Sequence, residues 1–128
     1  MSKTEYYRTT LRSLADWDNF LLKESRLRGP RANLELVSVV ADEGTKAQFE
    51  HFLTFNAERF PANTQGEFLA VCGAVGLGRL LAQGDCSVLE TLRKRAFDSR
   101  WRVREGVAMA FQRLGDTHMS RLLSEMER

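Results

Sequence analysis

Apolar residues recur along this chain at the three- and four-residue spacing of a helix that buries one face. Together with glycine, proline and capping positions, this pattern predicts eight helices, at 3–14, 16–28, 30–43, 45–55, 64–82, 87–97, 99–114 and 117–127. Pro30 suits the first position of the third helix, and Thr64 and Glu67 have the spacing of a capping box at the start of the fifth. The strict alternation of a half-buried strand does not occur in the sequence. The pattern therefore predicts an all-α fold.

The predicted helices fall into pairs in which a glycine ends one helix before the next begins. Gly84-Asp85 and Gly115-Asp116 are 31 residues apart, and Gly44 lies about 40 residues before the first of them. An N-terminal pair at 3–28 precedes three expected repeats, near 30–55, 64–97 and 99–127. One helix pair buries too little apolar surface to fold alone, so neighbouring pairs must stack. We expect a single domain over residues 1–128, built as a short right-handed α-α solenoid.

The last repeat has the most distinctive pattern, carried by Asp98, Trp101, Val103, Arg104, Glu105, Val107, Ala108, Ala110, Leu114 and Gly115-Asp116. An Asp at the turn, followed by a Val-Arg pattern and small residues, resembles the HEAT-repeat family. The preceding repeat matches in fewer positions and lacks the Trp and Arg: Val71, Ala74, Val75, Leu77 and Gly84-Asp85. The resemblance implies an armadillo-like helical solenoid that serves as a scaffold for protein binding. A more distant resemblance to DNA alkylation repeat proteins implies nucleic-acid binding or DNA base excision as an alternative.

Composition adds limits to this interpretation. The chain is 43% apolar and 28% charged, and no stretch approaches the roughly 18 uncharged apolar residues of a membrane span. Two cysteines and no apolar leader favour a cytoplasmic protein with reduced thiols and no membrane partner. Residues 93–128 hold nine Lys or Arg and five Asp or Glu, a net charge of +4, which leaves −2 for residues 1–92. Such a basic third could attract an anionic partner.

The candidate binding residues surround Trp101. On one continuous helix Arg100 and Arg104 are four residues apart and share a face, and the indole beside them could stack on a base. Asp98 is the nearest acid for the cationic sugar that base excision creates. The alternative is structural: Trp101 packs between repeats, Asp98 caps the helix, and Arg104 pairs with an acid one turn earlier.

Other residues add weaker hypotheses. Arg93 and Lys94 suit either the negative end of a helix dipole or a phosphate group. Glycines within the fifth helix predict close approach of a neighbouring helix, and they are Gly73, Gly76 and Gly78. An apolar stripe near the C-terminus predicts either homodimerisation through the end of the solenoid or a longer solenoid of which this chain is a part. Its residues are Met119, Leu122, Leu123 and Met126. Neither Gly-x-Ser-x-Gly nor His-Glu-x-x-His occurs in the sequence. We therefore expect a non-enzymatic interaction module without cofactors, binding a protein or, alternatively, nucleic acid.

Overall fold

A computed structural model describes the backbone of residues 2–126 and the side chains of residues 2–116. Within that part of the chain there is no strand, and the elements are α1 (Lys3–Ser13), α2 (Asp18–Glu24), α3 (Leu34–Glu43), α4 (Lys46–Phe52), α5 (Gln65–Ala82), the short 3-10 helix η1 (Cys86–Val88), α6 (Leu89–Arg95) and α7 (Trp101–Met126). The predicted all-α class is confirmed.

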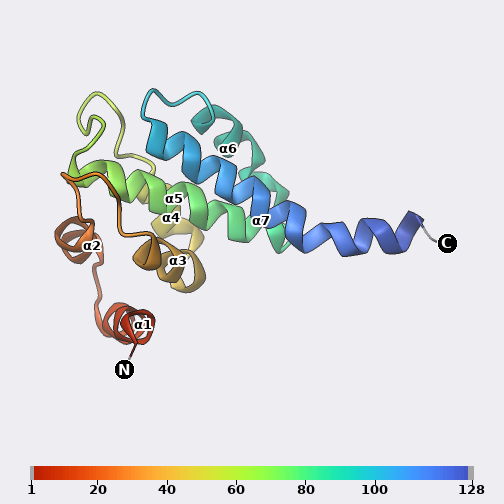
Figure 1. Ribbon diagram of the computed structural model, residues 1–128, viewed down its shortest axis with the longest axis horizontal. Helices are drawn as coiled ribbons and strands as arrows, with labels where there is room; N and C mark the ends of the chain where they lie inside the picture. Colours follow the sequence, from red (N-terminus) through yellow and green to blue (C-terminus); the bar gives the residue numbers. More distant parts are fainter. Residues whose placement is uncertain (1, 127–128) are drawn as a thin grey trace.

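Helix α5 lies at the centre of the fold (Figure 1). It packs against α2, α3, α4, η1, α6 and α7, while α1 packs on α3. Nearly every position of α5 from Gly66 to Gly78 is apolar or small and buried, and a helix that is apolar all round is stable only when it is covered on all sides. Buried side chains from α1 through α7 join it in one continuous apolar cluster.

Glycines let two helices come close to α5. A methyl group added at Gly73 would lie 2.7 Å from the backbone oxygen of Phe49 in α4. One added at Gly78 would lie 2.6 Å from the Cα of Ala110 in α7. Real carbon atoms do not approach so closely, so glycine is required wherever these backbones meet. The prediction of close helix approach at these glycines is confirmed.

The end of the chain differs from its prediction. Gly115 does not break the last helix, since α7 runs from Trp101 to Met126 without interruption and extends beyond the other helices (Figure 1). A glycine within a helix costs only about 1 kcal/mol relative to alanine. Beyond its own helix backbone and chain neighbours, no described atom lies within 4 Å of a Cβ built at Gly115. Gly84, by contrast, has a φ of +105° just after the end of α5. The apolar stripe predicted for self-association, from Met119 to Met126, lies outside the described side chains.

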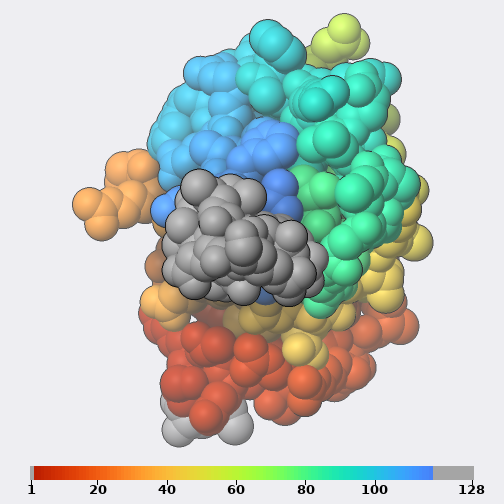
Figure 2. Space-filling view, turned by 90° about the vertical axis from the view of Figure 1, so that its right-hand side faces the viewer, coloured from red at the N-terminus to blue at the C-terminus, as the bar shows by residue number. Residues whose placement is uncertain are grey.

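The segment between α2 and α3 is also longer than predicted. Helix α3 begins at Leu34, not at Pro30, because the buried Asn33 caps it by accepting a hydrogen bond from the Leu36 N–H at 3.2 Å. Residues 25–33 therefore form an irregular segment, and part of it stands out from the surface at the left of Figure 2, beside α7. The predicted capping box at the start of α5 is likewise wrong. Thr64 donates its hydroxyl to the carbonyl of Pro61 and makes no cap hydrogen bond.

Candidate functional site

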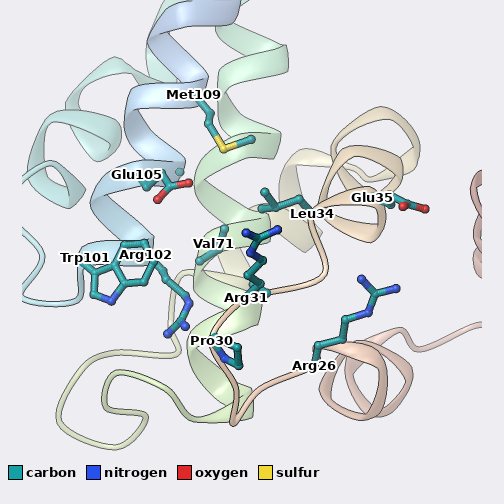
Figure 3. A pocket seen from close by; sticks show the side chains of 12 residues that line it. Arg26, Pro30, Arg31, Leu34, Glu35, Val71, Trp101, Arg102, Glu105 and Met109 are labelled. Atoms are coloured by element: carbon teal, nitrogen blue, oxygen red, sulfur yellow. The ribbon is translucent and has the colours of Figure 1, made fainter.

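A pocket of about 230 Å³ lies between α7 and the segment that leads into α3 (Figure 3). Three parts of the chain form it. The segment before α3 and the first turn of α3 supply Arg26, Pro30, Arg31, Ala32, Leu34 and Glu35, α5 supplies Val71, and α7 supplies Trp101, Arg102, Glu105, Gly106 and Met109. Mostly apolar lining with a few charged groups is typical of a binding pocket.

Two large apolar side chains at the pocket are only half covered. Trp101 is 49% exposed and Leu34 is 48% exposed, and they come from opposite sides of the pocket (Figure 3). Val71 between them is buried. Exposed apolar residues are common singly on protein surfaces, but a group of them around a concavity indicates a contact surface. Sequence analysis singled out Trp101 and missed Leu34.

A buried ion pair holds one wall of the pocket in place. Arg102 Nη1 lies 3.1 Å from Glu67 Oε1, and both residues are buried. Arg102 Nη2 donates to the carbonyl of Gly29 at 2.9 Å, and the N–H of Gly29 donates to Asn63 Oδ1 at 3.0 Å. Glu67 Oε1 also accepts from the N–H of Asn63 at 2.9 Å. These bonds fix the segment before α3 against α5 and α7.

The Arg102 guanidinium also stacks on Trp101, with its carbon 4.6 Å from the centre of the indole. Cation–π stacking of this kind orients the ring. The indole is therefore held at the rim although half of its surface is exposed. Two polar atoms of the ion pair, Glu67 Oε2 and Arg102 Nε, are buried and have no hydrogen-bond partner in the described part of the chain.

The free positive charges at the pocket come from the segment before α3, which was not predicted to form a site. Arg26 and Arg31 are exposed, and neither makes a hydrogen bond or an ion pair with the described residues. Figure 3 shows the Arg31 side chain extending over the pocket, with the Glu105 carboxylate on the opposite wall. The charge of Arg102 is balanced by Glu67. The pattern that could have revealed this site is three arginines within six residues around Gly29-Pro30, at positions 26, 28 and 31.

Arg100 lies away from the pocket, and the prediction that it shares a surface with Arg104 is wrong. Helix α7 begins only at Trp101, and Arg100 is 2% exposed. Its Nη1 donates to the carbonyls of Phe55 and Phe60 at 2.8 and 3.0 Å. Arg100 therefore ties the segment between α4 and α5 to the start of α7, and four of its five side-chain N–H groups are used within the protein. Because it is also buried, it is not accessible to a phosphate.

Asp98 is the partner of Arg100 and also lies beneath the surface. Its Oδ1 and Oδ2 accept from Arg100 Nε and Nη2, each at 2.9 Å, and Oδ1 also accepts from the Arg100 N–H. Burial raises the pKa of Asp98, but the hydrogen bonds from Arg100 lower it by more, so the pKa is below its usual value. The structural interpretation of Asp98 at the helix start fits this geometry.

The remaining predicted site residues are exposed but dispersed. Arg104 donates to the backbone carbonyls of Asp98 and Ser99 at 2.8 and 3.0 Å, and not to an acid one turn earlier as expected. Arg93 and Lys94 are exposed in the last turn of α6 and do not line the pocket. Among all the predicted site residues, only Trp101 lines it.

Among the described residues, no three His, Cys, Asp or Glu side chains gather closely enough to hold a metal ion. Both cysteines are free, and burial raises the pKa of the Cys72 thiol, which keeps it protonated and unreactive. No helix in the described part of the chain has the length and apolar character needed to cross a membrane.

Comparison with protein-family models, curated proteins and solved structures found no match.

Proposed function

We propose that this protein is a non-enzymatic interaction module that binds a protein partner by taking one of its apolar side chains into the pocket beside Trp101. The observation that carries the proposal is the position of Trp101 and Leu34, two half-exposed apolar residues on opposite sides of a preformed 230 Å³ pocket. Leaving both in water is unfavourable by about 25 cal/mol per Å² of apolar surface, and a partner's side chain would remove that cost.

A HEAT-like solenoid remains part of the proposal. Helices α3, α5 and α7 begin the three expected repeats, and they pack in that order with α5 in the middle (Figure 1). This order supports the interpretation. The third repeat consists of the single helix α7, and α2 also packs on α5, where a regular solenoid would have contacts only between neighbouring repeats.

The test is selection from a phage-displayed library of amphipathic helical peptides. Wild-type protein is the target, and the variant Leu34→Asp is used for counter-selection, because it places a charge in the pocket without opening the core. The matched control is Leu14→Asp, another leucine that is partly exposed, at 38%, but outside the pocket.

We expect enriched peptides that carry large apolar residues and bind wild type and Leu14→Asp with similar affinity. Their affinity for Leu34→Asp should fall at least about tenfold, equivalent to 1.4 kcal/mol. Peptides that bind Leu34→Asp as well as wild type, or no enrichment at all, would contradict the proposed function. Circular dichroism at 222 nm confirms that each variant is folded.

A further inference from the structure

A second hollow adjoins the pocket, and the two lie in a row between α3 and α7. The second hollow is lined by Ser38, Val75, Met109, Gln112, Arg113 and Asp116, so that Met109 belongs to both. Val71 and Val75, one in each hollow, are buried and lie one turn apart on α5. We call this feature the α3–α7 groove.

One face of α7 follows the groove along its length. One row of groove residues on α7 is spaced by four, four, three and four positions, and its members are Trp101, Glu105, Met109, Gln112 and Asp116. At 1.5 Å per residue they cover about 22 Å, or four helical turns. A partner segment of about four turns would fill this length. Its apolar residues at positions i and i+4 would be about 6 Å apart, matching Val71 and Val75.

The walls of the groove favour a helical occupant. Helices α3, α5 and α7 already use their backbone N–H and C=O groups within themselves, and the described part of the chain has no strand edge. An extended peptide would therefore bury backbone groups without partners, which is costly. A helix satisfies its own backbone and presents only side chains, as in other helix-in-groove complexes.

Charge changes sign along the α3–α7 groove. At the end near Pro30, Arg26 and Arg31 are exposed cations without partners among the described residues. The exposed Glu35 also belongs to this end, and its side chain points away from the pocket, whereas Arg31 extends over it (Figure 3). Near the middle lies Glu105, and the other end carries the exposed Asp116. Arg113 at that end is offset by Asp42, 3.3 Å away on α3. A uniform polyanion such as nucleic acid would be attracted by the first end and repelled by Glu105 and Asp116.

From these charges and this shape we infer that the α3–α7 groove binds an acidic-to-basic amphipathic helix of a protein partner, lying parallel to α7. Acidic residues in its first turn meet Arg26 and Arg31, and basic residues in its last turn meet Asp116. Acids near the N-terminus and bases near the C-terminus also stabilise the partner helix itself through its dipole. This inference rests on the proposed function, to which it adds the charge pattern and the direction of the partner.

The experiment compares two fluorescein-labelled peptides of about 14 residues, four helical turns. Both carry the apolar residues selected above. One has Glu in its first turn and Lys in its last, and its isomer has these charges exchanged. Fluorescence anisotropy gives the dissociation constant of each for wild type, for Arg26→Glu/Arg31→Glu, and for Arg93→Glu/Lys94→Glu. The last variant makes the same change of charge on α6, outside the groove.

We expect wild type and the α6 variant to prefer the acidic-first peptide by about tenfold at low salt. The preference should shrink in 1 M salt, because the shorter Debye length weakens interactions between exposed charges. Arg26→Glu/Arg31→Glu should reverse the preference. Equal affinity for both peptides, with loss of both in Leu34→Asp, would overturn the inference and leave the proposed function intact. If neither peptide binds, or if Leu34→Asp binds both as tightly as wild type does, both the inference and the proposed function are overturned. Tighter binding of a labelled DNA duplex through Arg26 and Arg31 would also overturn the inference.

Discussion

The buried pair of Glu67 and Arg102 allows the sharpest test of how the pocket is held. The perturbation is Arg102→Met, which keeps most of the aliphatic stem and removes the guanidinium. Two charge-assisted hydrogen bonds are lost, to Glu67 at 3.1 Å and to the Gly29 carbonyl at 2.9 Å. Each contributes about 1.5–3 kcal/mol, so we expect the variant to lose about 4 kcal/mol. That is within the roughly 3–5 kcal/mol that follows when one partner of a buried ion pair is removed.

The double variant Glu67→Gln/Arg102→Met shows whether charge is the cause. Glutamine keeps an oxygen that can accept from the Asn63 N–H, and it leaves no charge in the fully buried position of Glu67. We therefore expect the double variant to be more stable than Arg102→Met alone, with a loss of about 2 kcal/mol, since a neutral amide avoids the cost of an unpaired buried charge. The free-energy changes of substitutions at two contacting residues do not add.

Urea unfolding followed by circular dichroism measures both losses. With a slope of about 2 kcal/mol per M, Arg102→Met should lower the midpoint by about 2 M. Arg93→Met removes an exposed arginine without partners in the described part of the chain, so it should change stability by no more than about 0.5 kcal/mol. The reasoning fails if Arg102→Met costs less than about 1 kcal/mol, or if the double variant is the less stable of the two.

Three further predictions use the same unfolding assay. Gly78→Ala should destabilise the protein because the new methyl group would meet the backbone of Ala110, whereas Gly115→Ala, with open space around it, should stabilise it by about 0.5–1 kcal/mol; equal effects would contradict the close approach of α5 and α7. Because the folded-state pKa of Asp98 is lowered, its contribution is present above the unfolded value of about 3.9 and is lost as pH falls through the folded value. Asp98→Asn should thus cost about 3 kcal/mol at pH 7 and progressively less below about pH 4; a difference that does not depend on pH would be the contrary result. Trp101→Ala should cost about 1–2 kcal/mol, since half of the side chain is already exposed, and a loss above about 3 kcal/mol would indicate a purely structural tryptophan.

The helices that depend on local pattern could be predicted from the sequence. The continuous apolar run of α5 and the glycines within it predict a central helix approached closely by its neighbours, and the structure has both features. The end of α3 at Gly44 could also be predicted from the sequence. In the structure α3 ends at Glu43, and Gly44 donates its N–H to the carbonyl of Val40. The continuation of α7 was not, because Gly115 has the same Gly-Asp context as Gly84, and only the backbone geometry separates them.

The candidate site depends on contacts between distant parts of the chain, and this is why most of it was missed. The carbonyls that take up Arg100 belong to residues 45 and 40 positions earlier in the sequence. Arg102 reaches Gly29 across 73 positions. Residue type and helical spacing cannot show which two of three neighbouring arginines, at 100, 102 and 104, are buried. They do identify Trp101, which lines the pocket.

The central place of α5 in both the chain and the fold has a consequence for cooperativity. Elements before and after it in sequence, from α2 to α7, rest on the same helix, so removing either flank would uncover an apolar face. Stability is therefore shared across the described part of the chain instead of being divided among separate repeats, as it would be in a long one-dimensional array. Amide hydrogen exchange should show this directly: the N–H groups of α5 should exchange only through global unfolding, while those of α1, which rests mainly on α3, should exchange by local opening.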